Sequence, residues 1–286
     1  SSDPIDLLAT TKLLPGSRRS QVLGKETLKT LASLFPGRDQ VEGGVASLSR
    51  VSRSADSTTK ILLELSDGLK VETVIIPWKG GRSTACLSSQ VGCEQGNESL
   101  VLCCQELIRF QGCKFCATGR MGKLRSLSSD EILAQMFFAK KICRQQSLPD
   151  VTNVVFMGMG EPADNANAVR REIPILASRD HFHLAASKIT VSTVDPNQLA
   201  FDLFADLPCV LAWSVHAVSD PLRKRLVPTS RDKMTTLRQR LIDALRCRPP
   251  NPRTVMLEVA LIKDVNESLD HAKDLAKCAK VIMDEV

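Results

Sequence analysis

The sequence contains no tyrosine, and aromatic residues make up only 4% of its 286 residues. This scarcity argues against a protein that holds single-stranded nucleic acid mainly by stacking bases on aromatic side chains. Long apolar runs are also missing, because stretches such as Cys209 to Val215 fall far short of the roughly 18 residues of a membrane span. With 43% hydrophobic and 24% charged residues, the composition is that of a globular protein without a membrane partner.

Ten cysteines are spread over the chain with one tight cluster, and the N-terminal sequence has no charged segment followed by an apolar one. This pattern differs from that of a small secreted domain held by disulfides, and it favours a reducing compartment. Basic residues outnumber acidic ones by 38 to 32, which gives a net charge of +6. The excess favours a polyanionic partner such as RNA, although ordinary solvated surface explains much of it.

The pattern of apolar residues divides the chain into three parts. Residues 1–50 show helical periodicity interrupted by Pro-Gly turn signals at Pro15 and Pro36, which predicts a small helical module. Residues 51–83 predict a short β segment, in which two strand-like runs joined by Ser66-Asp67-Gly68 form a hairpin.

Residues 84–286 alternate strand-like runs with amphipathic helices, the order of a parallel sheet with helical crossovers. Expected strands cover 84–88, 153–157, 188–193, 209–215 and 254–262, and expected helices begin near Ser128, Met234 and Ser268. Ser128 and Glu131 form a capping-box pattern at the first helix. We therefore predict a barrel-like or doubly wound α/β domain with its active site at the carboxyl ends of the strands.

The strongest local signal is the C-x2-C motif of Cys113 and Cys116, with Cys93 upstream. Thiolates at this spacing can point at one centre and hold a metal ion or an iron–sulfur cluster. A pair of buried or redox-active cysteines is an equally good interpretation of an isolated motif.

Other candidate residues follow or lie within apolar strands. Gly158 to Pro162 comes directly after a strand, where glycines permit close backbone approach and Glu161 can accept hydrogen bonds from an ammonium group. Ser214 and His216 are two residues apart on a predicted strand and so share a face. Glu258 interrupts an apolar run and needs a partner, but the sequence assigns it no role.

Several ordered motifs together resemble the radical-SAM adenine-C2 RNA methyltransferases, the RlmN and Cfr family. They are SSQVGC at 88–93, ATGRMG at 117–122, VVFMGMGEP at 154–162, ITVST at 189–193, AWSVHA at 212–217, LVP at 226–228 and the segment 258–266. The resemblance covers nearly everything from Glu72 onward and implies a partial (β/α) barrel of radical-SAM type.

The resemblance implies both cofactors and the residues that hold them. Three thiolates bind a 4Fe-4S cluster in this family, and one iron left free takes the amino and carboxylate groups of S-adenosylmethionine, whose sulfonium an electron from the cluster cleaves. The implied cluster ligands are Cys93, Cys113 and Cys116. The implied S-adenosylmethionine contacts are Gly160, Glu161, Ser192, Ser214 and His216.

The implied reaction is methylation of adenine C2 in ribosomal RNA, with transfer RNA as a further substrate. Glu72 matches the family's proton acceptor, and Cys86 matches the thiol that releases the RNA by attacking a methyl-bridged cysteine, an attack that leaves a disulfide bond. Without the resemblance, Cys86 is best interpreted as a small core residue, and Glu72 as a residue on the polar side of an edge strand. A flavodoxin or ferredoxin is expected as the electron donor, and the protein is expected to be a monomer.

The spacing of the cluster motif departs from the family pattern. The family has C-x3-C-x2-C, whereas nineteen residues separate Cys93 from Cys113 here, and removal of residues 96–111 restores the family spacing. The segment is therefore either a translated intron, as codons carrying splice signals at its ends would allow, or a genuine loop that leaves the ligands neighbours in space. We expect a cytoplasmic location, or an organelle matrix or stroma if the intron indicates a eukaryotic source.

The C-terminal end departs as well. The family carries its methyl-accepting cysteine beyond a further strand, and neither Cys247 nor Cys278 matches that motif, so we expect a truncated chain that does not complete methyl transfer. Two other functions remain open: a non-catalytic or zinc-binding RNA-binding relative, and another radical-SAM enzyme with a small substrate. Basic residues near the expected strand end form the expected RNA contact, namely Arg223, Lys224, Arg225, Arg231, Lys233, Arg238 and Arg240.

Overall fold

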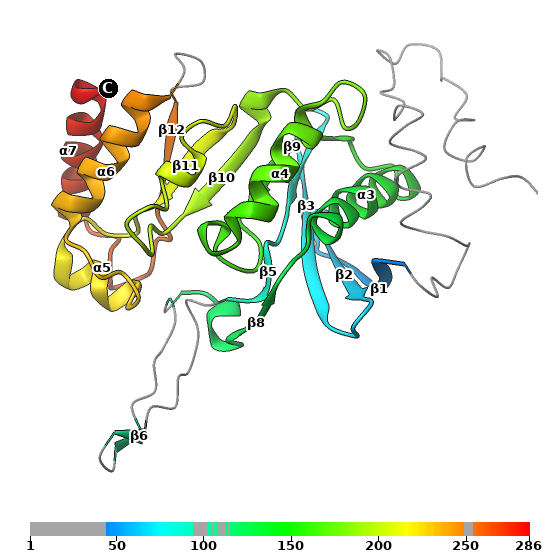
Figure 1. The fold of residues 1–286 in the computed structure, drawn as a ribbon, viewed down its shortest axis with the longest axis horizontal. Coiled ribbons are helices and arrows are strands. Elements are labelled where there is room, and N and C mark those ends of the chain that lie inside the picture. Colours follow the sequence, from blue (N-terminus) through cyan, green and yellow to red (C-terminus); the bar gives the residue numbers. More distant parts are fainter. Residues whose placement is uncertain (1–43, 94–101, 104–105, 108–112, 114, 249–253) are drawn as a thin grey trace, which may run out of the picture.

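The computed structural model describes residues 44–93, 102–103, 106–107, 113, 115–248 and 254–286. Its centre is an eight-stranded sheet with the order β1-β2-β3-β4-β9-β10-β11-β12 (Figure 1). Strands β1 to β4 pair antiparallel, whereas β4 and β9 to β12 are parallel neighbours. Their bounds are β1 Ala46–Arg53, β2 Thr59–Leu65, β3 Lys70–Trp78, β4 Arg82–Cys86, β9 Val151–Phe156, β10 Ile189–Thr193, β11 Val210–Ser214 and β12 Val255–Glu258.

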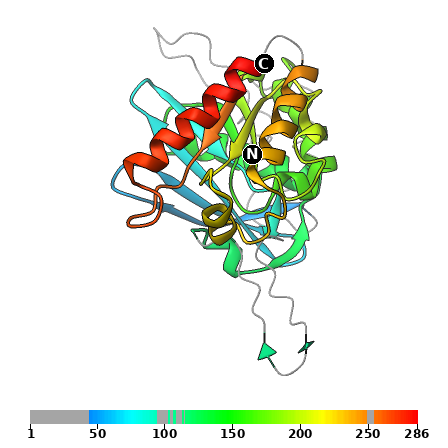
Figure 2. The ribbon, with the colours of Figure 1, turned by 90° about the vertical axis from the view of Figure 1, so that its left-hand side faces the viewer.

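Helices connect the parallel strands, as parallel pairing requires a long crossover. Helix α3 precedes β9, α4 joins β9 to β10, α5 and α6 join β11 to β12, and α7 follows β12. Figure 1 shows α3 and α4 in front of the sheet, and Figure 2 shows α6 and α7 together at the β12 end. Their bounds are α3 Ser129–Gln145, α4 Ala166–Ala177, α5 Asp220–Leu226, α6 Met234–Cys247 and α7 Leu269–Glu285. None of the helices in the described residues has the length and apolar character needed to cross a membrane.

Shorter elements complete the described structure. Two small antiparallel sheets pair β5 Gln90–Gly92 with β8 Lys123–Ser126, and β6 Leu102–Cys103 with β7 Glu106–Leu107. The second pair lies within the segment 96–111, whose other residues fall outside the described part of the chain. Single 3₁₀ turns occur at Thr118–Arg120, Pro162–Asn165, Ala186–Lys188 and Asp202–Phe204.

The register of the sheet decides which side chains share a face. Val74 pairs with Cys86, and Cys86 with Val155, which is opposite Thr190. Because side chains alternate along each strand, this face carries Glu72 and Cys86. Counted onward through β10, β11 and β12, the same face carries Ser192, Ser214 and Glu258.

The opposite face of the sheet is apolar and lies under the helices. Val71, Ile75, Val154 and Val191 on this face are each 0% exposed, and Leu211 continues the layer on β11. Helix α3 contacts β1, β2, β3 and β9, and α4 contacts β10. Burial of this face supplies the main driving force for folding, whereas the polar face is left for the site.

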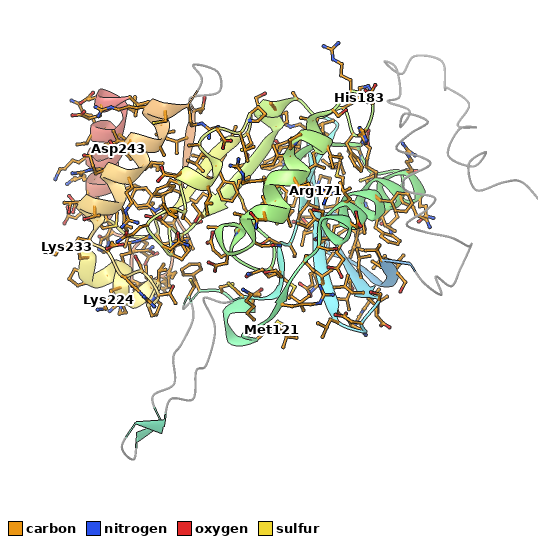
Figure 3. All side chains as sticks on the ribbon, in the orientation of Figure 1. Met121, Arg171, His183, Lys224, Lys233 and Asp243 are labelled. Carbon is orange, nitrogen blue, oxygen red and sulfur yellow. The ribbon has the colours of Figure 1, made fainter. Side chains whose placement is uncertain are left out.

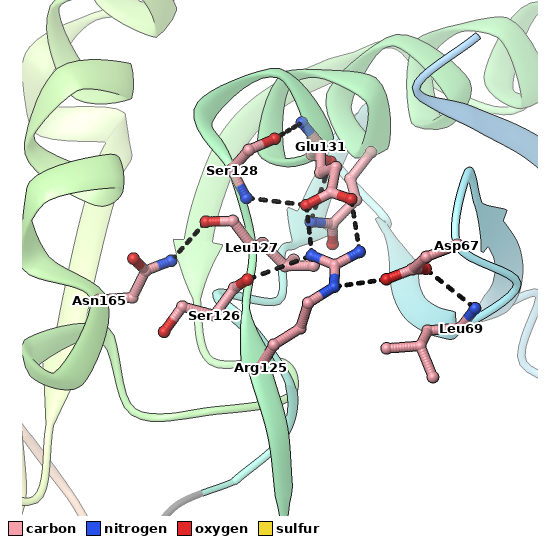
Figure 4. Close-up of polar contacts among 9 residues, drawn as sticks. Asp67, Leu69, Arg125, Ser126, Leu127, Ser128, Glu131 and Asn165 are labelled. Carbon is pink, nitrogen blue, oxygen red and sulfur yellow. Dashed lines mark hydrogen bonds and ion pairs between the residues drawn. The ribbon is translucent and has the colours of Figure 1, made fainter. Parts of the chain in front are cut away.

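A network around Arg125 joins the β2–β3 turn, β8 and the start of α3 (Figure 4). Arg125 donates to both carboxylate oxygens of Glu131, at 2.8 and 2.7 Å, and its Nε donates to Asp67 at 2.6 Å. Glu131 also accepts from the backbone N–H of Ser128, whose hydroxyl accepts from the Glu131 N–H, so the predicted capping box is confirmed. The paired guanidinium explains how a 5% exposed carboxylate is accommodated.

The sequence pattern located most elements of the sheet domain. The hairpin formed by β2 and β3, all five predicted strands after residue 83, and helices α3, α6 and α7 are confirmed, although β12 ends at Glu258, before the predicted 262. Helices α4 and α5 were not predicted. Pro174 lies inside α4, and a proline lowers the expectation of a helix.

The predicted division of the chain needs correction at its N-terminal side. Residues 1–43, which hold most of the predicted helical module, lie outside the described residues. Residues 46–50 belong to strand β1 and are not helical. The predicted β segment 51–83 is continuous with the barrel-like sheet through the pairing of β3 with β4, so the two parts share one sheet.

Candidate functional site

The candidate site lies at the carboxyl ends of the parallel strands, where the sequence placed it. Glu161 follows β9, Ser192 lies near the end of β10, Ser214 ends β11, and His216 comes two residues later. In a parallel sheet these ends meet at one edge, which brings residues far apart in sequence together. Each residue is positioned by a backbone or side-chain hydrogen bond.

Glu161 connects the end of β9 with the end of β10. Its Oε1 accepts from the N–H of Ala163 at 3.1 Å and thereby caps the 3₁₀ turn, and its Oε2 accepts from the N–H of Val194 at 3.0 Å. The side chain is 3% exposed, and this burial raises its pKa to about 7. A cationic group beside it would favour the ionised form.

The glycines around Glu161 are required by close packing. A Cβ at Gly160, whose φ is +98°, would lie 2.6 Å from the Cβ of Gln90 and 2.8 Å from the hydroxyl of Ser89. A Cβ at Gly158 would lie 2.8 Å from the carbonyl oxygen of Leu87. The Gly-rich turn after β9 therefore packs directly on the chain that follows β4.

His216 is held in one tautomer. Its Nδ1 accepts from the N–H of Ala260 at 3.1 Å, so a neutral ring carries its proton on Nε2. Burial, together with the nearby charge of Arg223, lowers the His216 pKa to about 4, so the ring is neutral near pH 7. Nδ2 of Asn266 donates to the carbonyls of His216 and Ala260, at 2.8 and 2.9 Å, and fixes the loop after β12 against it.

The C-x2-C motif reaches this site through Phe115. The Phe115 and His216 rings are 4.1 Å apart between centroids, and Cys113 and Phe115 pack with Ala217 in a small apolar cluster. Cys116 donates its N–H to the carbonyl of Cys113 at 3.0 Å. The cysteine pair therefore lies beside the carboxyl end of β11.

The thiol of Cys113 also lies near Glu161. Burial raises the Cys113 pKa to about 12; Cys116 and then Glu161 raise it further, and Arg223 opposes the shift. A thiol in such surroundings is protonated unless a metal centre supplies positive charge.

Cys93 is placed by the β5–β8 pair. It is 9% exposed, and its N–H donates to the carbonyl of Gly122 at 3.0 Å. Within the described ranges, no three His, Cys, Asp or Glu side chains form a group that could hold a metal ion, so Cys93 is not assembled with Cys113 and Cys116 as a ligand set. The thiols fit iron–sulfur chemistry, but binding by all three requires Cys93 to move relative to the pair.

Cys86 and Glu72 share the polar face of the sheet. Burial is the main reason that the pKa of the Cys86 thiol is raised to about 11, and the carboxylate of Glu258 contributes. Glu72 forms an ion pair with Lys60 at 2.9 Å, and both side chains are about half exposed. Among the described side chains, the free thiols are those of Cys86, Cys93, Cys113, Cys116, Cys143, Cys209, Cys247 and Cys278.

Two basic residues that were expected to contact RNA have structural roles. Arg223 is 1% exposed and donates to the backbone carbonyls of Ser214 and Val194, at 3.0 and 2.6 Å. Arg240 pairs with Asp195, at 3.3 Å, and with Asp232. The sequence pattern could not separate these two arginines from their exposed neighbours.

A solved radical SAM methyltransferase from Sphaerobacter thermophilus superposes on this chain with a TM-score of 0.68, and the two sequences are 33% identical. The superposition covers 91% of this chain and 69% of the solved chain. This chain belongs to the radical SAM methyltransferase family. Curated relatives include the probable dual-specificity RNA methyltransferase RlmN of Salinibacter ruber, 38% identical over 231 residues, and the dual-specificity RNA methyltransferase RlmN of Campylobacter jejuni (strain 81-176), 36% identical over 241.

These alignments cover 78% and 79% of this radical SAM chain but 58% and 62% of the relatives. The chain thus spans about three fifths of the length of the curated relatives that it matches. No family model matches the sequence.

Proposed function

We propose that this chain carries the catalytic sheet of a radical SAM enzyme that methylates C2 of adenine in ribosomal RNA, with transfer RNA as a second substrate. The contact of Phe115 with His216 carries the proposal, because it joins the cysteine pair to the strand ends that hold Glu161, Ser192 and Ser214. The names of the curated relatives support the RNA substrate.

In the proposed enzyme Cys93, Cys113 and Cys116 would hold a 4Fe-4S cluster once Cys93 lies beside the pair, and Gly160, Glu161, Ser192, Ser214 and His216 would surround S-adenosylmethionine. When bound, the cluster supplies an electron that cleaves the sulfonium of S-adenosylmethionine, and the protein supplies position and electrostatics. Glu161 fits the amino group of this ligand, because an ammonium ion compensates its buried carboxylate.

Cys86 and Glu72 are proposed to handle protons and RNA release on the same face. The raised pKa of Cys86, about 11, keeps the thiol protonated near pH 7, so its attack as a thiolate requires removal of a proton. Glu72 lies on that face with one carboxylate oxygen paired with Lys60. We propose a flavodoxin or ferredoxin as the electron donor.

The proposed RNA surface surrounds α5 and the start of α6. Lys224, Arg225, Arg231 and Lys233 are exposed there, and Figure 3 labels Lys224 and Lys233 at this end of the molecule. Arg223 and Arg240 are excluded because their guanidinium groups bind within the protein. The net charge of +6 is consistent with a polyanionic substrate.

The test is reductive cleavage of S-adenosylmethionine by anaerobically purified, iron-loaded protein, followed by chromatography. We expect cleavage in the wild type and none in Cys113→Ala/Cys116→Ala, with Cys247→Ala as the matched control, since Cys247 is exposed and distant in sequence. Binding of stoichiometric zinc in place of iron, or iron-loaded protein that leaves the sulfonium intact, would refute the proposed chemistry. A salt-dependent RNA affinity is expected separately, and its absence would refute the RNA substrate.

A further inference from the structure

A cavity of about 250 Å³ lies between helices α6 and α7, which Figure 2 shows side by side. The part of α7 that lines it is one face of the helix, with residues at positions i, i+3, i+4 and i+7, namely Asp274, Lys277, Cys278 and Val281. Met234 and Arg238 line it from α6, about one turn apart on that helix. The start of α6 is anchored to α5, because Oδ1 of Asp220 accepts from the N–H of Met234 at 2.7 Å.

The charges that line the cavity do not balance. Nζ of Lys277 lies 3.0 Å from the carboxylate of Asp274, so these two charges offset each other. The half-buried guanidinium of Arg238 contacts the thiol of Cys278 and forms no ion pair with a carboxylate of the described residues. One positive charge is thus left over, and a planar guanidinium suits an anion with paired oxygens such as a phosphate.

The rest of the lining is largely apolar. Met234 and Cys278 are 7% and 6% exposed, and Val218 and Val281 add apolar surface that is partly open to solvent. The volume lies a little below the roughly 300–1,000 Å³ of sites for drug-sized ligands, so the cavity fits one small, flat group. A planar group of this size with an attached anion describes a nucleotide.

The position of the cavity relates it to the candidate site. A second cavity, of about 400 Å³, is lined by His216, and Val218 belongs to the linings of both cavities. Lys233, which is exposed in the proposed RNA surface, directly precedes Met234. RNA that extends from the candidate site at His216 to the exposed surface at Lys233 therefore passes the cavity between α6 and α7.

We propose that the cavity between α6 and α7 binds one unstacked nucleotide of the RNA, with its base against the apolar side chains and its phosphate on Arg238. This inference rests on the proposed RNA substrate, and it separates Arg238 from the exposed basic residues with which the sequence grouped it. Binding of single bases in pockets and of phosphates by arginine is common in proteins that hold unpaired nucleic acid. A metal ion is disfavoured, because the described residues there include no group of three His, Cys, Asp or Glu side chains.

The first experiment tests the base. Fluorescence anisotropy measures binding of a labelled oligoadenylate and of an abasic strand of the same length and charge. The wild type should bind the oligoadenylate about 10-fold more tightly, as expected when one base is held. Val281→Phe narrows the cavity without a change in charge and should reduce this preference to less than about 3-fold. Met283→Phe is the matched control, because Met283 is 78% exposed on the same helix and does not line the cavity.

The second experiment tests the phosphate with the same two strands at several salt concentrations. Arg238→Met should weaken binding of both strands and lower the salt slope by about one unit. Lys280→Met removes the same charge from an exposed position on α7 outside the cavity, so it should weaken binding by less than about 2-fold and keep the wild-type slope.

The outcomes separate this inference from the proposed function. A wild type that binds neither strand overturns both the RNA substrate and the nucleotide site. A wild type that binds the two strands equally, with a normal salt dependence, overturns the nucleotide site alone. The same holds if Arg238→Met behaves as Lys280→Met does. If circular dichroism shows that Arg238→Met is not folded, Val281→Phe provides the second variant, and a full preference for the oligoadenylate in that folded variant overturns the site.

Discussion

Replacement of Arg223 should destabilise the edge of the sheet that carries the candidate site, because this side chain joins the ends of two strands. Its Nη1 donates to the carbonyls of Ser214 and Val215, and its Nη2 to that of Val194. Its guanidinium also lies 5.6 Å from the ring centroid of Trp213. At 1% exposure, these groups have little access to water that could replace the lost contacts.

The expected loss of stability follows from the three backbone carbonyls that accept hydrogen bonds from Arg223. A hydrogen bond to a charged group contributes about 1.5–3 kcal/mol, and a buried polar group left unpaired costs about 1–3 kcal/mol. Because neighbouring groups relax in part, we expect Arg223→Met to lower the free energy of unfolding by about 3–5 kcal/mol, a large share of the roughly 5–15 kcal/mol of a typical domain. Arg225→Met, at an exposed position in the same helix, should change it by less than about 0.5 kcal/mol.

Urea denaturation and RNA binding at several salt concentrations measure both effects. Arg225→Met should weaken RNA binding and reduce the salt slope by about one unit, whereas folded Arg223→Met should keep the wild-type slope. The reasoning is refuted if Arg223→Met unfolds at the wild-type urea concentration. It is refuted equally if Arg223→Met lowers the salt slope as Arg225→Met does.

Two further changes test buried positions. Glu172 is 0% exposed, and burial raises its pKa to about 7. Between about pH 4.5 and 7 the folded state therefore binds more protons than the unfolded state. The free energy of unfolding consequently falls as pH rises through that window. Glu172→Gln should remove this loss, which is about 3 kcal/mol at pH 8. The urea midpoint of the variant relative to that of the wild type should therefore be higher at about pH 8 than at about pH 5, and the same difference at both pH values would contradict the reasoning. Gly160→Ala should lower stability by about 2 kcal/mol or more because of its φ of +98° and its contact with Gln90. In thermal unfolding Gly80→Ala, where a Cβ meets nothing within 4 Å, should be near neutral, and similar melting temperatures for the two variants would count against the packing argument.

The sequence predicted those parts of the fold that local patterns determine. The alternation of apolar runs and amphipathic helices located β9, β10 and β11, and the capping box located the start of α3. The pattern also predicted that the candidate residues Glu161, Ser192 and Ser214 lie near one edge of the sheet, because the carboxyl ends of parallel strands meet there.

Contacts between distant residues were beyond the reach of local patterns. Arg223 and Arg225 look alike in sequence, and only the packing of α5 on β11 separates the buried guanidinium from the exposed one. Glu258 was noticed as a charge in an apolar run, but its partners Ser192 and Ser214 lie 66 and 44 residues away in sequence. Long-range pairing of this kind requires the register of the sheet.

The measurement that tests the radical SAM assignment most directly is the iron and sulfide content of the anaerobically reconstituted protein, compared between the chain as it stands and a variant that lacks residues 96–111. Removal of this segment restores the C-x3-C-x2-C spacing of Cys93, Cys113 and Cys116. We predict about four irons per chain in the shortened variant, and loss of this iron when Cys93→Ala is added to that variant. The longer chain should bind less iron, because its binding is limited by how closely Cys93 approaches Cys113 and Cys116. Iron content that is absent from both forms, or unaffected by Cys93→Ala, would contradict a three-cysteine cluster.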